Sequence, residues 1–192
     1  MRHDPCVAQG RVITYDQVVT VGSQLFHRTG GLDMEELAQA ANVSRATLYR
    51  VAGSRDKVLG DVLWRQGSRV LTQIMATTEG HGVDRLIAIS ERFHHDLRGY
   101  PPLLTFLRDD PATAFRVLLT ADARVHSRFV EQWRTLLEEL VSAGELVLPM
   151  SPADAAFVFV RLGESLLYSD LFGDREPDLD LASRVQRALL RT

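Results

Sequence analysis

The polar residues with the clearest chemical pattern lie between positions 44 and 57. Four cations stand there beside a single acid, Asp56. Cationic side chains neutralise phosphates, and neighbouring hydroxyl groups can hydrogen-bond to phosphates or to base edges. The candidate DNA-contacting residues are Ser44, Arg45, Thr47, Tyr49, Arg50 and Arg55. A solvated charged face is the plainer interpretation of such a run, and the helical pattern around it favours a nucleic-acid contact.

Residues that could support catalysis or bind a metal form no comparable pattern. His94 and His95 are adjacent, and adjacent residues on a helix point about 100° apart, so both cannot hold one ion. One turn further on, Arg98 and Gly99 supply no metal ligand. The sequence has no glycine-rich phosphate loop and no Gly-x-Ser-x-Gly nucleophile elbow. We therefore predict no catalytic residue, no metal site and no cofactor.

Two short helices around a tight turn are predicted to position the cations. Asp33 can cap the first of them, and Glu36 can reach back to complete a capping box. The apolar spacing predicts a helix from Met34 to about Ala41. Asn42 follows, and asparagine tolerates the left-handed backbone conformation that a sharp turn between helices needs.

The second helix is predicted to begin after Ser44, which can cap its first turn. Ala46 and Leu48 are the small and apolar residues that can hold it against the first helix, so its polar residues point outward. Two helices joined by a turn of a few residues form a helix-turn-helix, in which the second helix enters the major groove of DNA.

The string from Asp33 to Leu59 resembles the TetR family of transcriptional regulators. The matching residues are Leu37-Ala38, Val43-Ser44, Thr47-Leu48-Tyr49 and Gly53-Ser54. The departures are Asp33 for the usual Thr, Asn42 for Gly, Val51-Ala52 for His-Phe and Arg55 for Lys. Asp33 and Asn42 keep the cap and turn chemistry, whereas Val51-Ala52 lacks the two rings with which the family packs this corner and reaches a phosphate. Residues 101–108 and 111–114 are similar to the QsdR-like branch of the family.

The composition agrees with a globular protein of one medium or two small domains. The chain has 192 residues, of which 45% are hydrophobic, and a formal net charge of −3. No apolar stretch is long enough for a membrane span, and the N-terminus leads into no signal core, so we expect a cytoplasmic protein. Cys6 is the single cysteine, which excludes a disulfide framework. The cations are concentrated beside the motif, but they are few, so one subunit alone should bind DNA weakly.

We predict an all-α fold of about nine helices in two domains. Residues 1–58 form a three-helix DNA-binding domain with the helix-turn-helix, and residues 59–192 form a helical domain for effector binding and dimerisation. The first helix opens at Thr14 or Asp16 and ends at Gly30, and a fourth helix begins after the cap Ser54. The helices of the second domain that follow prolines or capping residues are predicted at 84–98, 103–108, 112–120, about 122–142, 152–172 and about 178–190.

The resemblance implies a homodimer, since in TetR-like regulators the last two helices pair with their copies in a second subunit. Two stripes of small and apolar residues match that expectation. The candidate interface residues are Ala156, Val160, Gly163, Leu167, Leu181, Val185 and Ala188. Two DNA-binding heads on a two-fold axis would bind the half-sites of a palindromic double-stranded operator.

The resemblance also implies a mostly apolar cavity for a small-molecule effector, whose binding releases the operator from a repressor. Several aromatic residues of the middle region are candidates, although each one alone is as easily explained as core. The candidate ligand-binding residues are Trp64, Phe93, Phe106, Phe129, Trp133 and Tyr168. The alternatives are a helical module that binds a small molecule or a protein partner without DNA and, less favoured, an enzyme.

Overall fold

The computed structural model of the protein describes residues 13–121, 123–171, 173 and 175–190. Cys6, the first twelve residues of the predicted DNA-binding domain, and Phe172, the predicted end of one helix, lie outside them. The described part of the chain is all-α, as predicted, and has no strand. Its helices are α1 (Tyr15–Thr29), α2 (Met34–Ala40), α3 (Arg45–Ala52), α4 (Arg55–Thr77), α5 (Gly82–Arg98), α6 (Pro101–Asp109), α7 (Pro111–Leu119), α8 (Val125–Ser142), α9 (Pro152–Leu167), the 3-10 helix η1 (Ser169–Leu171) and α10 (Leu179–Leu189).

Capping residues explain where most of these helices begin. Thr14 and Gln17 form a reciprocal capping box at α1. Asp33 caps α2 by accepting from the backbone N–H groups of Glu35 and Glu36, at 2.7 and 2.9 Å. The cap of α2 consists of these two bonds to Asp33, without the predicted return bond from the Glu36 side chain. Prolines occupy the first helical position of α6, α7 and α9, where no N–H group is needed.

Two helix boundaries differ from the sequence prediction by three residues or more. The helix expected from about residue 122 begins at Val125, because Arg124 takes the left-handed conformation with a φ of 58°. The helix expected over 152–172 ends at Leu167, and the chain continues in the short 3-10 helix. Both differences arise where the backbone leaves the α region at a residue that has no obvious helix-breaking side chain.

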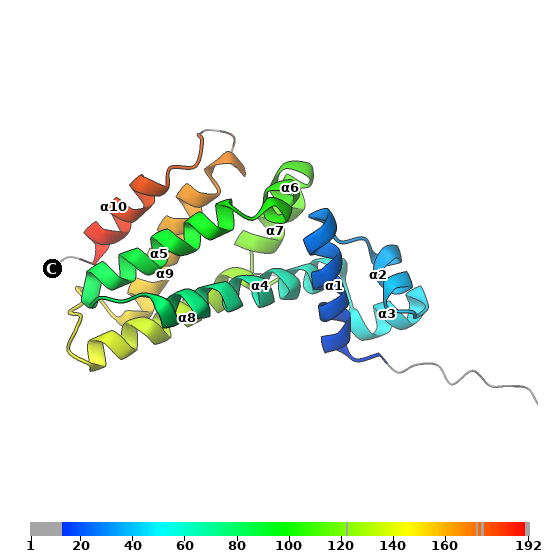
Figure 1. The fold of residues 1–192 in the computed structure, drawn as a ribbon, viewed down its shortest axis with the longest axis horizontal. Coiled ribbons are helices and arrows are strands. Elements are labelled where there is room, and N and C mark those ends of the chain that lie inside the picture. The colour runs from blue at the N-terminus through cyan, green and yellow to red at the C-terminus, as the bar shows by residue number, and fades with distance from the viewer. Residues whose placement is uncertain (1–12, 122, 172, 174, 191–192) are drawn as a thin grey trace, which may run out of the picture.

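Helix α4 connects the two ends of the molecule (Figure 1). We call α1, α2 and α3 the head and α5 to α10 the body. The 23 residues of α4 start beside the helix-turn-helix of α2 and α3 and run between the helices of the body. The predicted domain boundary after residue 58 falls inside this continuous helix. Helices α6 and α7 lie near the head, next to α1, while α5, α8, α9 and α10 form the rest of the body (Figure 1). None of the helices in the described ranges is long and apolar enough to cross a membrane.

The core of the helix-turn-helix head is shared with the body. One cluster of buried side chains joins α1 to α4 with α6 and α7. Within it the rings of Phe26 and Phe106 meet edge to face, with centroids 5.8 Å apart. A second cluster fills the body between α4, α5, α8 and α9. A single apolar core spans the head and α6–α7. Because this core is closely packed, a movement of α6 and α7 must also shift the head.

Candidate nucleic-acid interface and ligand cavity

The helix-turn-helix has the local geometry that its sequence predicts. Asn42 adopts the left-handed conformation with a φ of 54°, which confirms its role in the turn. The Ser44 hydroxyl caps α3 by accepting from the backbone N–H of Thr47 at 3.1 Å. Leu48 and Ala52 are 0% exposed, so they anchor α3 against the other helices of the head.

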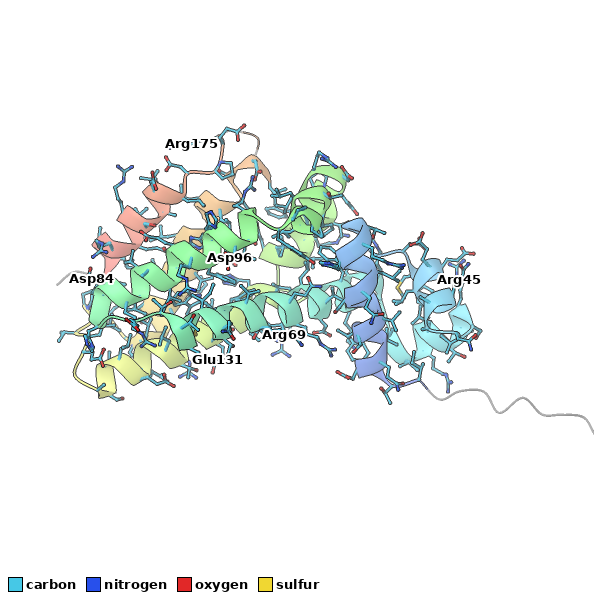
Figure 2. All side chains as sticks on the ribbon, in the orientation of Figure 1. Arg45, Arg69, Asp84, Asp96, Glu131 and Arg175 are labelled. Atoms are coloured by element: carbon cyan, nitrogen blue, oxygen red, sulfur yellow. The ribbon has the colours of Figure 1, made fainter. Side chains whose placement is uncertain are left out.

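The opposite face of α3 points into solvent. The Arg45 side chain is 62% exposed and lies 3.7 Å from Glu35, while Tyr49 is 44% exposed and Arg50 is also exposed. Figure 2 shows Arg45 at the end of the molecule that the head forms. Ala46 was expected to pack against the first helix, but it is exposed, because the buried stripe of α3 runs through Leu48 and Ala52 instead.

The other polar candidates of this region already have partners. The Ser44 hydroxyl donates to the Thr47 hydroxyl at 3.0 Å, in addition to capping the helix. Arg55 donates from Nε to the Leu32 carbonyl at 2.7 Å and from Nη1 to Asp110 at 3.1 Å. A phosphate would therefore compete with Asp110 for the Arg55 guanidinium.

Two ion pairs of opposite polarity join the start of α4 to α7. Arg55 pairs with Asp110, which caps α7, and the next residue, Asp56, accepts from Arg116 Nε at 2.6 Å. Burial by itself would raise the pKa of Asp110, but hydrogen bonds from Thr113 and Arg55 hold it below its usual value. The carboxylate thus stays ionised, and these pairs, which we call the α4–α7 bracket, fix the head relative to α7.

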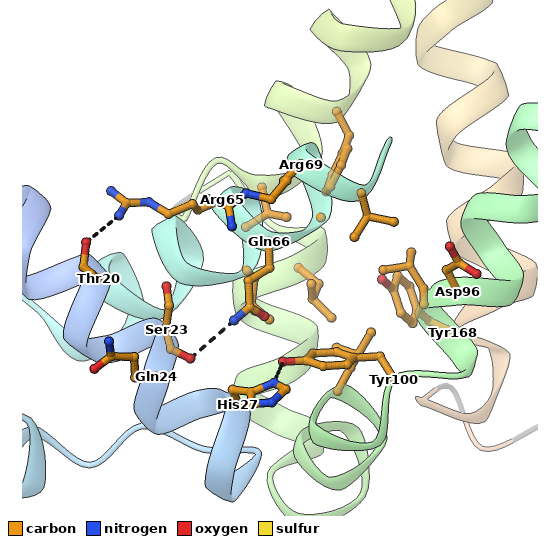
Figure 3. A pocket seen from close by; sticks show the side chains of 18 residues that line it. Thr20, Ser23, Gln24, His27, Arg65, Gln66, Arg69, Asp96, Tyr100 and Tyr168 are labelled. Atoms are coloured by element: carbon orange, nitrogen blue, oxygen red, sulfur yellow. Dashed lines mark hydrogen bonds between the residues drawn. The ribbon is translucent and has the colours of Figure 1, made fainter. Parts of the chain in front are cut away.

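A cavity of about 530 Å³ lies where the head meets the body. Figure 3 shows Thr20, Ser23, Gln24 and His27 of α1 on one side of it and Asp96 and Tyr168 on the other. Its apolar lining comes from the body and from α4, and consists of Leu63, Val70, Leu97, Leu103, Leu118, Val125 and Phe129. A ligand in this cavity would contact both the helix-turn-helix head and the body.

Hydrogen bonds line the head side of the cavity. His27 Nδ1 lies 3.1 Å from the Tyr100 hydroxyl, and Gln66 Nε2 donates to the Ser23 carbonyl at 3.4 Å (Figure 3). Burial raises the pKa of Tyr100, so its hydroxyl stays protonated. The α1 side chains were not among the predicted ligand-binding residues. Thr20, Gln24 and His27 recur at a spacing of three to four residues, and this polar stripe was the signal that could have indicated them.

A smaller recess of about 30 Å³ lies behind the cavity. It shares Leu97, Phe129 and Tyr168 with the cavity, and its other walls are Ser90, Phe93, His94, Trp133, Phe159, Val160, Glu164, Leu167 and Gln186. His94 is 6% exposed, and burial lowers the pKa of its imidazole to about 4, so the ring is neutral at ordinary pH. From the sequence, His94 was a candidate only for a metal ligand.

The six predicted ligand-binding aromatics do not line one common space. Phe129 and Tyr168 line both the cavity and the recess, and Phe93 and Trp133 line the recess alone. Phe106 belongs instead to the core shared by head and body. Trp64 packs edge to face on Phe129, with Arg128 over its ring, and lines neither space.

The predicted dimer residues divide between the interior and the surface. The four on α9 are buried in one chain, where a second chain cannot reach them: Ala156, Val160, Gly163 and Leu167. They face α5, α8 and α10 because α9 turns its most apolar stripe toward its own core. On α10, Ala188 is exposed and Leu181 and Val185 are half-buried.

The chain has a helix-turn-helix head, which a long helix joins to a helical body that contains a cavity. This architecture defines a class of transcriptional regulators in which one chain carries both parts. The family model described as the tetracyclin repressor-like, C-terminal domain matches residues 81–191, more than half of the chain. The chain therefore belongs to the TetR family, and it has the family's transcriptional-regulator fold with a ligand-binding C-terminal domain.

Solved structures of the family have the same fold. The TetR-family transcriptional repressor QsdR of R. erythropolis is 24% identical with a TM-score of 0.86, and the match covers 92% of this chain and 93% of that one. The fatty acid degradation regulator FadR of Bacillus halodurans is 17% identical with a TM-score of 0.54, covering 95% and 96%. A TetR-family regulator of Streptomyces coelicolor is 19% identical with a TM-score of 0.52, covering 91% and 78%. A search of curated protein sequences found no match.

Proposed function

We propose that this protein is a transcriptional repressor that binds a palindromic operator as a homodimer and is released by a small, largely apolar effector. The exposed face of α3 is the observation that carries the proposal. Arg45, Tyr49 and Arg50 project from a helix whose other face is fully buried. In a helix-turn-helix this face lies in the major groove, where arginine can bind guanine edges or phosphates.

The outer faces of α9 and α10 support the homodimer. On α9, Phe157 is 50% exposed, and Val158 and Leu162 are half-buried on the side away from the core. On α10, Leu181 and Val185 continue this apolar surface. We therefore assign the subunit contact to these five residues together with Ala188. This assignment keeps the three predicted residues of α10. On α9 it replaces the predicted residues, which are buried, by Phe157, Val158 and Leu162.

The position of the cavity supports release by a ligand. Its walls include Thr20 and Gln24 of the head and Leu103 and Leu118 of the body. A ligand that binds one arrangement of head and body more tightly than another shifts the population toward it, and the operator affinity changes by the ratio of the two affinities. In a dimer this arrangement sets the spacing of the two heads, which must match half-sites about 34 Å apart.

The proposal is tested by asking which DNA the protein selects. Fragments of the genome that encodes the chain are incubated with the purified protein, and the retained fragments are sequenced. We expect a palindromic site, and we expect the Tyr49→Ala variant, which keeps the buried anchors of α3, to lose it. Retention of fragments without a shared palindrome, or equal enrichment by the variant, would contradict operator recognition by α3.

A further inference from the structure

His94 has no hydrogen-bonding partner although it lies in the interior. Neither of its imidazole nitrogens bonds to any residue that the structure describes, and Nδ1 is fully buried. Buried polar groups in folded proteins are nearly always paired, because an unpaired one loses its hydrogen bonds to water without replacement. An unpaired imidazole beside a cavity is therefore an observation that needs a ligand or a water molecule to complete it.

The neighbouring side chains hold the imidazole in place without satisfying it. Gln186 uses its Oε1 to accept from Ser90 at 2.7 Å and its Nε2 to donate to the Phe159 carbonyl at 3.0 Å. At Gly163 an added Cβ would lie 2.9 Å from His94 Nε2, so only glycine leaves room for the ring. The packing of Gly163 and Gln186 thus fixes a neutral imidazole in the recess that adjoins the cavity.

A second polar group on the same wall is also available. Tyr168 is buried, lines both the recess and the cavity, and its hydroxyl makes no hydrogen bond with the described residues. Burial raises its pKa, so the hydroxyl remains a donor. His94 and Tyr168 together offer hydrogen bonds to a group that enters the recess from the cavity.

The charges around the recess disfavour an ionic group. Glu164 is the carboxylate on its wall, and it is paired with His126 at 2.8 Å and with Arg161 at 3.6 Å. None of the described recess residues supplies a free cation for an anion. A cation would have to displace the existing partners of Glu164. A charged group that left water for this recess would therefore be poorly compensated.

We propose that the recess around His94 selects the polar end of the effector, and that this end is an uncharged hydrogen-bonding group, such as a carboxamide or a ketone, carried on an apolar chain. The chain lies in the larger cavity against Leu103, Leu118 and Val125, and the polar end passes between Phe129 and Tyr168. The inference rests on the proposed ligand-responsive function and names the chemical class of its ligand.

The test compares three probes that share an eight-carbon chain and differ in the head group: octanamide is neutral, octanoate is an anion and octylamine is a cation. The Trp64→Phe background leaves Trp133 as the single tryptophan, and Trp133 lines the recess, so its fluorescence reports occupancy. We expect octanamide to bind the full-length protein about tenfold more tightly than either charged probe. Calorimetric titration of the protein with both tryptophans checks the affinities.

Variants at two neighbouring histidines separate the recess from general effects. His94→Leu should bring the three affinities to within about threefold of one another, and His94→Gln, which keeps a donor and an acceptor, should retain the preference. His95→Leu is the matched control, because His95 is exposed on the same helix and lines neither space. The preference should survive in this control.

Several outcomes would overturn the inference. They are octanoate or octylamine binding as tightly as octanamide, no octanamide binding, or a preference that survives His94→Leu, as it would if the recess held only a water molecule. If His94→Leu does not fold, the order of the three probe affinities on the wild type and on His94→Gln still shows whether the recess prefers an uncharged group. Octanamide that binds through His94 without changing operator affinity would contradict the proposed release and leave the recess assignment intact.

Discussion

The neutral imidazole of His94 links one residue to the pH dependence of stability. Its pKa is about 4 in the folded chain and about 6.5 when unfolded. Between these values the unfolded chain binds a proton that the folded chain does not, so the free energy of unfolding falls as the pH drops from 6.5 to 4, by up to about 1.4 kcal/mol per pH unit. The His94→Leu variant should escape this loss.

Thermal unfolding of both proteins between pH 7 and pH 4.5 measures the effect. The melting temperature of His94→Leu relative to the wild type should rise as the pH falls. His95→Leu, on the exposed side of the helix, should show no such trend. A constant difference between His94→Leu and the wild type would mean that His94 is not held neutral by burial.

Asp110 holds the guanidinium of Arg55, which we propose as a contact to a DNA phosphate. Asp110→Asn keeps the cap of α7, because asparagine also caps helices, but removes the charge that holds Arg55. We expect the variant to bind all DNA sequences several-fold more tightly at low salt. The slope of log affinity against log salt concentration should steepen by up to about one, which corresponds to one added phosphate contact. Arg55→Ala should weaken binding to all sequences and flatten the slope. Weaker DNA binding by Asp110→Asn would contradict the proposal that a DNA phosphate replaces Asp110 as the partner of Arg55.

Single residues were predictable from the sequence where their role is local. Asn42 and the capping residues act within four positions along the chain, so the motif alone indicated them. The partners of Arg55 and the missing partners of His94 depend on residues of distant elements, such as Asp110 and Gly163. Motif reasoning could identify Arg55 as a cation but could not know that a carboxylate already faces it.

At the scale of elements, the contact between α1 and α6 depends on Gly30. This residue has a φ of 70°, and an added Cβ would lie 2.6 Å from the Thr105 Cβ and 2.8 Å from the Pro102 carbonyl oxygen. Gly144 has nearly the same φ, 73°, with no atom near the added Cβ, so it isolates the cost of the conformation. Gly30→Ala should therefore cost more than Gly144→Ala.

We expect Gly144→Ala to lower the free energy of unfolding by about 1 kcal/mol and Gly30→Ala by about 3 kcal/mol, since the second adds a steric clash to the left-handed strain. Urea unfolding measures both values. Equal losses in the two variants would show that α1 and α6 are not closely packed at Gly30.

Helices were easier to predict than the faces they bury. Caps, prolines and apolar spacing indicated every α-helix to within a few residues at most ends. The face of α9 was misassigned because a stripe of small apolar residues fits a neighbouring helix of the same chain as well as one of a second chain. The cavity could not be located from aromatic residues, because α1 contributes polar residues to its lining.

At the scale of the whole molecule, the proposed function requires two heads joined in a dimer for tight DNA binding. Val185 lies on the proposed subunit contact of α10, and Val185→Asp would place a charge in it. We expect this variant to be monomeric by light scattering and to lose most of its operator affinity while its helical circular dichroism persists. Val147→Asp is the control, since Val147 is 71% exposed in the loop between α8 and α9. A dimeric Val185→Asp would place the interface elsewhere.

The most direct test of the account is the affinity of the dimer for the palindrome that it selects, measured by fluorescence anisotropy with Arg45→Ala and with Arg92→Ala as control. Arg92 is an exposed cation on α5, away from the reading face of α3. We predict that Arg45→Ala loses at least about tenfold in affinity and in preference over scrambled DNA, while Arg92→Ala matches the wild type. Unchanged binding by Arg45→Ala, or equal loss in both variants, would contradict recognition of the operator by α3.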